Sequence, residues 1–195
     1  GGGALSCGGD VRAPAIIVGG SNGLATQAII SPTGDCVADA LFFGEGEGRV
    51  ETMIQALVAD RDEPKAVRLR RASETVDGLW LANGPTDQEV RKAVCYEPEA
   101  EDLLTDYPVL DSDQAYTARL QVSYGCPAFC SFCFEGYGRK PYREIPQQTL
   151  VDTARTLKRV QGAEAIDLYS FNFNTHQDVL GLILDLNRIV DRVGL

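Results

Sequence analysis

The sequence predicts an α/β protein in which short strands alternate with helices. Runs rich in apolar residues at 15–18, 37–43, 119–124 and 165–171 are short and end at turn-forming residues, which is typical of buried strands. Other segments carry an apolar residue every three or four positions, which predicts helices with one buried face. Strands that alternate with helices along a chain favour a parallel sheet.

Composition limits the kinds of protein that this chain can be. Its 195 residues suggest one or two domains, and its formal net charge of −10 argues against general nucleic-acid binding, which needs clustered Lys and Arg. No apolar run approaches the roughly 20 residues of a membrane span. The first residues also lack the charged and apolar regions of a signal peptide, so we expect a cytoplasmic location.

Residues 1–60 are expected to form a parallel α/β piece. The strand at residues 15–18 ends in Gly19 and Gly20, and the run at 37–43 ends in the glycine-rich turn 44–48. A helix should follow, because Val50, Met53, Ile54, Leu57 and Val58 share one face.

Residues 61–114 are expected to be a connector. The segments 67–70 and 74–81 suggest small strands, with Asp77 and Gly78 in a hairpin turn between them. The acidic segment 97–102 is best explained as a solvated loop.

Residues 115–195 should contain strand, cysteine loop, helix, strand and helix in that order. Pro146 should open the first helix and Gly162 should end it. The second helix has an apolar face over residues 179–190, a capping pair in Thr175 and Asp178, and a stop at Gly194. His176, the only histidine, is expected at the surface or in a capping role.

Three cysteines, Cys126, Cys130 and Cys133, carry most of the chemical information. A short loop brings their sulfurs together at little cost in closure entropy, and soft thiolates suit iron–sulfur clusters or zinc. Four protein ligands normally close a structural site, whereas a reactive site keeps one position open. No fourth Cys or His lies nearby, so the spacing favours a [4Fe–4S] cluster with one open iron.

The C-x3-C-x2-C loop, with Phe132 before its last cysteine and a strand before it, resembles the signature of the radical S-adenosylmethionine (radical SAM) superfamily. The resemblance implies that S-adenosylmethionine fills the open iron position and is cleaved to a 5′-deoxyadenosyl radical, which abstracts hydrogen from a substrate. A flavodoxin-like or ferredoxin-like protein would donate the electron. Residues 115–195 would form the first β/α units of a partial TIM-type barrel, so we expect a fragment; the chain also does not begin with Met.

The resemblance also names residues that would contact S-adenosylmethionine. The residue matching Phe132 packs near the adenine in the family, largely through its backbone; shielding of the cluster is a compatible alternative. The family's Gly-Gly-Glu-like segment is absent at the end of the second strand. Asn172 and Asn174 stand there as positional candidates, and an equally good explanation is that they are turn residues.

Residues 1–60 resemble the carboxyl-terminal part of the Rossmann-like (flavodoxin-like) cobalamin-binding domain of one branch of the superfamily. Gly19 and Gly20 are then candidate cobalamin contacts, and cobalamin-dependent methyl transfer becomes a candidate reaction; tight turns alone would also explain both glycines. The branch's Asp-x-His-x-x-Gly motif is absent, so no histidine of this segment would bind cobalt.

Two alternatives remain open. A methylthiotransferase of the same superfamily would need a second cluster, for which Cys7, Cys36 and Cys95 supply the number but not the family's spacing. A zinc-binding interaction module without catalysis would use the same three cysteines. The sequence does not identify the substrate.

Overall fold

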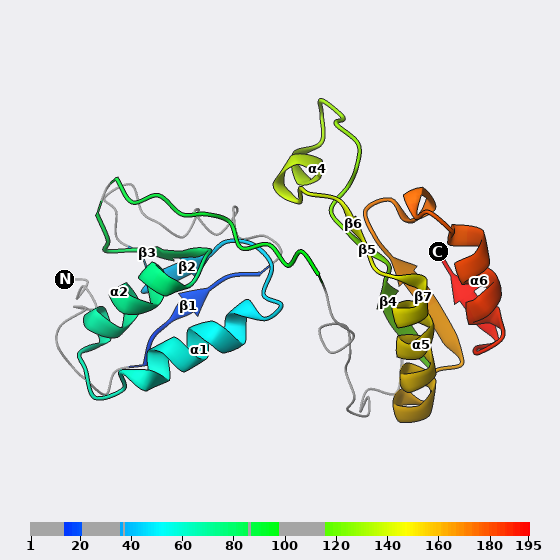
Figure 1. Cartoon of the computed structure of the whole chain (residues 1–195), viewed down its shortest axis with the longest axis horizontal. Helices are drawn as coiled ribbons and strands as arrows, with labels where there is room; N and C mark the ends of the chain where they lie inside the picture. The colour runs from blue at the N-terminus through cyan, green and yellow to red at the C-terminus, as the bar shows by residue number, and fades with distance from the viewer. Residues whose placement is uncertain (1–13, 21–35, 37, 86, 98–115) are drawn as a thin grey trace, which may run out of the picture. The chain divides into compact units, whose positions relative to one another are not determined.

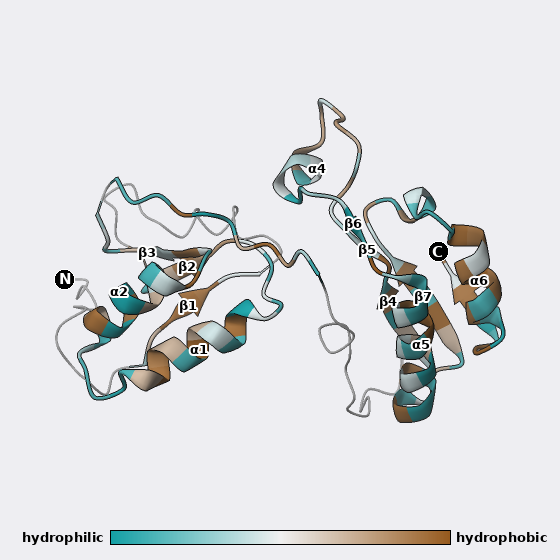
Figure 2. Ribbon diagram, in the orientation of Figure 1, coloured by the Kyte–Doolittle hydropathy of each residue, from teal (hydrophilic) through white to brown (hydrophobic). Residues whose placement is uncertain are grey.

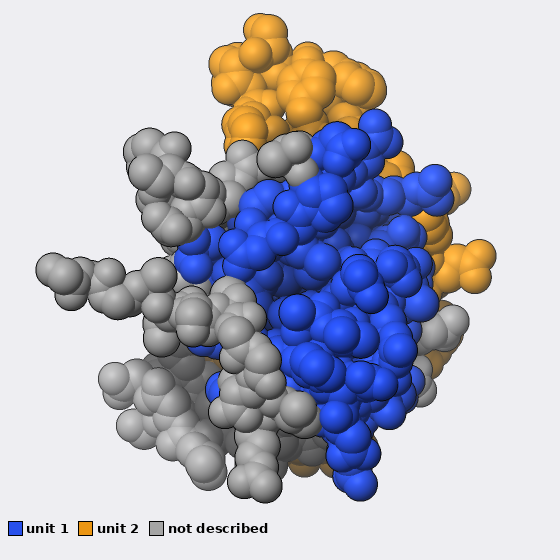
Figure 3. All heavy atoms as spheres, turned by 90° about the vertical axis from the view of Figure 1, so that its left-hand side faces the viewer, with its two compact units in different colours: residues 1–95 blue, residues 96–195 orange. Residues whose placement is uncertain are grey.

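A computed structural model describes residues 14–20, 36, 38–85, 87–97 and 116–195 of the chain. The chain divides into two compact units, residues 1–95 and 96–195, which are coloured separately in Figure 3. Each unit has its own hydrophobic core, so we describe the two separately. Within the described residues, no helix is both long and apolar enough to cross a membrane.

Unit 1 contains a small mixed sheet. Its strands are β1 (Ile17–Val18), β2 (Ala40–Phe42) and β3 (Leu79–Leu81), in the order β1-β2-β3. β1 and β2 are parallel, whereas β3 runs antiparallel to β2 and places Trp80 opposite Leu41. The parallel β1–β2 pair confirms the two strands expected in this part of the sequence.

Two helices cover this sheet: α1 (Arg49–Ala59) and α2 (Lys65–Thr75). Gly48 precedes α1 with a φ of 64°, a conformation that glycine adopts without steric cost. Figure 1 shows both helices beside this sheet. Ala40 and Phe42 of β2 share one core cluster with residues of both helices. The buried apolar residues of the helices are Met53, Leu69 and Ala72, and Val76 follows directly after α2 in the same core.

The expected strand at residues 67–70 is wrong, because this segment lies inside α2. Val67 and Leu69 alternate with two arginines, which imitates a strand over four residues. The longer pattern is helical, since Leu69, Ala72 and Val76 recur every three or four positions and are buried. β3 pairs with β2 instead of closing a hairpin with that segment, and both α2 and β3 belong to unit 1.

Unit 2 contains a parallel sheet of β4 (Thr117–Gln121), β7 (Ala165–Tyr169) and β8 (Arg192–Gly194), in the order β4-β7-β8. Helices α5 (Gln147–Gln161) and α6 (Val179–Asn187) pack on one face of this sheet (Figure 1). Pro146 begins α5, and Gly162 ends it with a φ of 66°, as expected. The core between the layers includes Leu120, Leu150, Ile166, Leu182 and Leu186.

The third parallel strand, β8, was not expected. The predicted helix continued to Gly194, but α6 ends at Asn187 and the chain then turns into β8. Ile189 and Val190 continue the apolar pattern because Val190 packs into the core from the turn. A Cβ at Gly194 would lie 2.0 Å from Oδ1 of Asp167 on β7, so the Asp167 carboxylate would have to move to admit a larger residue.

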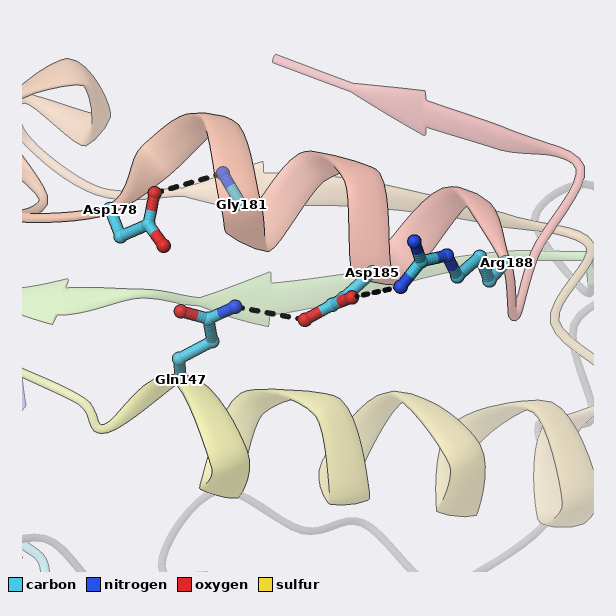
Figure 4. Close-up of polar contacts among 5 residues, drawn as sticks. All are labelled: Gln147, Asp178, Gly181, Asp185 and Arg188. Atoms are coloured by element: carbon cyan, nitrogen blue, oxygen red, sulfur yellow. Dashed lines mark hydrogen bonds and ion pairs between the residues drawn. The ribbon is translucent and has the colours of Figure 1, made fainter.

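One polar contact joins α5 to α6, and another caps the first turn of α6 (Figure 4). Gln147 Nε2 donates to Asp185 Oδ2 at 2.9 Å, and Arg188 Nη1 lies 2.8 Å from Asp185 Oδ1. Asp178 caps α6 by accepting a hydrogen bond from the Gly181 backbone N–H at 3.0 Å. Thr175, the other half of the expected capping pair, instead binds the Asn172 carbonyl.

Unit 2 also contains a separate two-stranded sheet, formed by β5 (Ser123–Tyr124) and β6 (Arg143–Glu144). They pair antiparallel, with Ser123 opposite Glu144 and Tyr124 opposite Arg143. The expected single strand at 119–124 is therefore two strands, β4 and β5. The short helix α4 (Phe134–Gly138) lies between β5 and β6 in the chain.

The leucines of α6 provide a test of which face is buried. Figure 2 shows that α6 is largely apolar, yet Leu182 is fully buried whereas Leu184 is 63% exposed. We expect Leu182→Ala to lower the free energy of unfolding of unit 2 by about 2–5 kcal/mol, because it leaves a cavity. Leu184→Ala should stay within about 0.5 kcal/mol. Hydrogen exchange of peptides from β4 and β7 in urea measures both, and equal losses would contradict this packing.

Candidate metal centre

The three cysteines lie in one loop that the β5–β6 ladder closes at its base. Residues 126–133 join β5 to α4, and Figure 1 shows the loop and α4 extending from the ladder away from the β4-β7-β8 sheet. The loop follows the carboxyl end of β4, the end at which parallel β/α folds gather their functional residues. This placement agrees with the expected strand followed by a cysteine loop.

Gly125 lets the two ends of this segment approach each other. Its φ of 70° lies in the left-handed region. A Cβ at this position would lie 2.3 Å from the carbonyl oxygen of Arg139 and 2.6 Å from that of Pro141. Only glycine therefore fits where the chain enters and leaves the cysteine loop.

None of the five cysteines that the structure describes is in a disulfide, and Cys126, Cys130 and Cys133 are free thiols. Cys133 precedes α4, and its Sγ accepts a hydrogen bond from the Gly136 backbone N–H at 3.2 Å. Its own N–H donates to the Cys130 carbonyl at 3.0 Å. Cysteine sulfur is a ligand that soft metals prefer, so the donor set suits a soft metal centre.

The structure does not gather the three sulfurs into a finished coordination site. Among the residues that it describes, no group of three or more His, Cys, Asp or Glu side chains is arranged to hold a metal ion. Cys130 is exposed, whereas Cys126 and Cys133 are half-buried. The fit to a metal centre therefore rests on the chemistry of three free thiols in one short loop.

Lys140 contacts this loop, and sequence reasoning missed it. Its Nζ donates to the Cys126 carbonyl at 2.5 Å and to the Ala128 carbonyl at 2.7 Å. The same nitrogen lies 3.8 Å from the centre of the Phe129 ring, a cation–π contact. Lys140 lies 14 residues after Cys126, and no sequence motif connects the two positions. Only the fold could therefore reveal this contact.

Aromatic side chains surround the loop and are largely exposed. Phe132, the candidate neighbour of adenine, is 90% exposed, and Phe129 and Phe134 are also exposed. Tyr137 closes the loop onto α4: its hydroxyl donates to the Phe129 carbonyl at 3.2 Å, and the two rings meet edge to face. Exposed aromatic groups of this density commonly mark a binding surface.

The end of β7 is tied to the base of the loop. Ser123 on β5 and Ser170 after β7 share a hydrogen bond of 2.7 Å. Asn172 is half-buried, and its carbonyl accepts from the Thr175 hydroxyl at 2.7 Å in the short 3₁₀ helix η2 (Phe173–Thr175). Asn174 lies within η2 and is exposed. Both asparagines thus stand at the carboxyl end of β7, and turn formation involves the backbone of Asn172.

Tyr142 and Glu144 form a polar group on the outgoing side of the loop. The Tyr142 hydroxyl donates to Glu144 Oε1 at 2.9 Å and lies 3.2 Å from the Thr175 hydroxyl. Glu144 also accepts from the Gln177 backbone N–H at 3.1 Å. Burial raises the pKa of Tyr142, so its phenol is protonated at neutral pH and can serve as the donor.

Of the two expectations for His176, the surface position is wrong, whereas the capping role is confirmed, because His176 is the C-cap residue of η2 and its backbone N–H donates to the Phe173 carbonyl. The side chain is buried, with 7% of its surface exposed. Its Nδ1 lies 3.3 Å from the Asp178 backbone N–H, which can only donate, and its Nε2 lies 3.2 Å from the Ile145 carbonyl, which can only accept. These partners require a neutral ring with its proton on Nε2, so His176 is a structural link between β6 and α6.

Gly19 and Gly20, the candidate cobalamin contacts, follow β1 in unit 1. A Cβ on Gly19 would lie 2.9 Å from Cβ of Phe42, so close packing against β2 already explains this glycine. Gly20 has a φ of 113°, and no described atom lies within 4 Å of the position that its Cβ would take. The backbone of Gly20 is therefore open on that side within the described residues.

The fold resembles that of a solved enzyme. Two structures of the radical S-adenosylmethionine methyltransferase TsrM from Kitasatospora setae match, with TM-scores of 0.56 and 0.55 and 17% sequence identity in each. One contains a tryptophan substrate and the analogue aza-SAM, and the other contains cobalamin and a [4Fe-4S] cluster. The matches cover 88% of this chain but only 32% and 33% of those chains.

This chain thus spans about a third of the length of the TsrM structures. The likeness shows the fold, a mixed α/β chain with a parallel sheet, as the sequence predicted. No protein-family model matches the chain, and no curated protein matches it.

Gly125 allows a direct test of how the loop is closed. Gly125→Ala should destabilise unit 2 more than Gly162→Ala, a matched change at another glycine of positive φ that has nothing described within 4 Å of its Cβ position. The Gly162 change carries only the left-handed strain of about 1–2 kcal/mol. The contact with Arg139 and Pro141 should add about 1–3 kcal/mol. Urea unfolding of both variants measures the difference, and equal losses would show that the close approach is not limiting.

Proposed function

We propose that this chain is part of a radical S-adenosylmethionine enzyme of the cobalamin-dependent branch, with Cys126, Cys130 and Cys133 as the ligands of a [4Fe–4S] cluster. When bound, the cluster supplies the electron that cleaves S-adenosylmethionine to a 5′-deoxyadenosyl radical. This radical would abstract hydrogen from a substrate of unknown identity, and cobalamin-dependent methyl transfer is the proposed outcome. A flavodoxin-like or ferredoxin-like protein is the proposed electron donor.

The position of the cysteine loop carries this proposal. Three free thiols lie in one loop at the carboxyl end of β4, the first strand of the parallel β4-β7-β8 sheet. Parallel β/α folds place their chemistry at that end of the strands. The likeness to TsrM, which is described as a radical S-adenosylmethionine methyltransferase, adds support at the level of the fold.

For S-adenosylmethionine we propose contacts at the ends of β5 and β7. Phe132 follows β5 in the cysteine loop, and its exposed ring and backbone are accessible to an adenine. Asn172 and Asn174 follow β7, at the same end of the sheet. Their amides can donate and accept hydrogen bonds, which suits the amino and carboxylate groups of the methionyl moiety.

For cobalamin we propose unit 1 as part of the binding domain, with the backbone of Gly20 as its open contact. Gly19 is the weaker candidate, because packing against Phe42 accounts for it. The chain offers no histidine to cobalt: His176 is its only one, and both ring nitrogens already have partners in unit 2. A cobalamin bound to this chain would therefore lack an axial imidazole from it.

Iron content and electron paramagnetic resonance (EPR) test the cluster. After anaerobic reconstitution, the chain should hold about four irons, and the signal of the reduced cluster should change when S-adenosylmethionine is added. Cys126→Ala, Cys130→Ala and Cys133→Ala should each lose most of this iron. Cys36→Ala and Cys95→Ala are the matched controls and should keep it.

Other outcomes separate the alternatives. About eight irons, with a loss of about half in Cys36→Ala or Cys95→Ala, would favour a methylthiotransferase with a second cluster. One equivalent of zinc without iron in anaerobically purified protein would favour a zinc-binding interaction module. An unchanged EPR signal in folded protein with S-adenosylmethionine would contradict the proposal.

The absence of an axial imidazole gives a separate prediction. No nitrogen splitting in the EPR spectrum of bound cob(II)alamin should come from a histidine of this chain. His176→Asn should leave that spectrum unchanged, because His176 does not reach cobalt in this account. A nitrogen splitting that disappears in His176→Asn would overturn the assignment.

A further inference from the structure

We propose that Lys140 is a positioning residue for the cluster ligands: its ammonium holds the first half of the cysteine loop and raises the reduction potential of the bound cluster. This inference rests on the proposed function and extends it to a residue outside the cysteine motif. The inference is supported by three contacts of the Lys140 Nζ, with the Cys126 carbonyl, the Ala128 carbonyl and the Phe129 ring.

The first argument is geometric. Nζ of Lys140 binds the carbonyls of Cys126 and Ala128, at 2.5 and 2.7 Å, so it spans the start of the loop that contains the first ligand. Its position 3.8 Å from the Phe129 ring centre fixes the residue just before Cys130. Hydrogen bonds to a charged donor are stronger than neutral ones, so one side chain restrains the approach to two of the three cysteines.

The second argument concerns where Lys140 is anchored. It stands directly before Pro141, whose carbonyl packs against Gly125 at the base of the loop. Strand β6 begins two residues after Pro141 and pairs with β5. The ladder therefore holds the backbone near Lys140 in place. Since loops are generally more mobile than paired strands, the Lys140 side chain connects the cysteine loop to a more rigid part of the fold.

The third argument is electrostatic. Three thiolates make the centre anionic, and one-electron reduction adds a further negative charge. Lys140 is half-buried and its ammonium binds carbonyls of the ligand loop, so it interacts with the cluster through less water than an exposed charge and favours the more negative, reduced state. Charge and hydrogen bonding near iron–sulfur clusters set their potentials, which makes the potential the appropriate measurement.

Two variants and one control isolate this role in the full chain. Lys140→Met removes the charge and the donors but keeps an unbranched stem, whereas Lys140→Arg keeps the charge. Lys158→Met is the matched control, because Lys158 also donates to a backbone carbonyl, that of Ile189, near the carboxyl end of α5.

Two measurements are needed, of which one uses no metal. In the metal-free chain, deuterium uptake of a peptide that covers residues 126–133 should become about tenfold faster in Lys140→Met. In the reconstituted chain, an anaerobic redox titration followed by EPR should show a lower midpoint potential in Lys140→Met. Lys140→Arg should restore the potential toward that of the original chain, and Lys158→Met should change neither quantity.

The two measurements also separate this inference from the proposed function. Unchanged uptake and potential in Lys140→Met, or equal changes in Lys158→Met, would overturn the role of Lys140. A chain that takes up no iron would overturn the proposed function and the effect on potential. The deuterium comparison would then still support or overturn the restraint of the loop by Lys140.

Discussion

The candidate metal centre depends on the short antiparallel ladder between β5 and β6. This ladder holds the two ends of the segment 125–142 side by side, and Gly125 permits the contact with Arg139 and Pro141 that closes it. With the ends fixed, gathering three sulfurs requires the ordering of one short loop only, which lowers its entropic cost. The hydrogen bonds of Lys140, Tyr137 and Ser170 all act on an element that the ladder has already positioned.

Much of the fold could be predicted because its core elements follow simple periodicities. The strands near Ile17, Leu41 and Ile166 are apolar runs between turn residues, and α5 has Pro146 and Gly162 at its ends. The cysteine loop was placed after a strand because its spacing is local in the sequence. Features of this kind are encoded within a few consecutive residues, so a single sequence is enough to find them.

The features that were missed are of two kinds: local periods that were misread and contacts between distant residues. Alternating arginines hid the helical period of α2, and Val190 extended the apparent period of α6 from a turn that leads into β8. The burial of His176 follows from its place between Ile145 and Asp178. The contacts of Lys140 arise because β6 returns the chain to the start of the loop. The contacts of His176 and Lys140 leave no local signature, so sequence reasoning could not supply them.

The buried imidazole of His176 also makes the chain convenient to observe. It is the only histidine, and it lies in the core of unit 2 with a defined tautomer. Its ring nitrogens should therefore give one isolated pair of nuclear magnetic resonance signals, which disappear from their native positions when unit 2 unfolds. The only tryptophan, Trp80, lies on β3 of unit 1 and provides a fluorescence signal for that unit. Each half of the molecule thus carries its own intrinsic spectroscopic label, and neither requires a chemical dye.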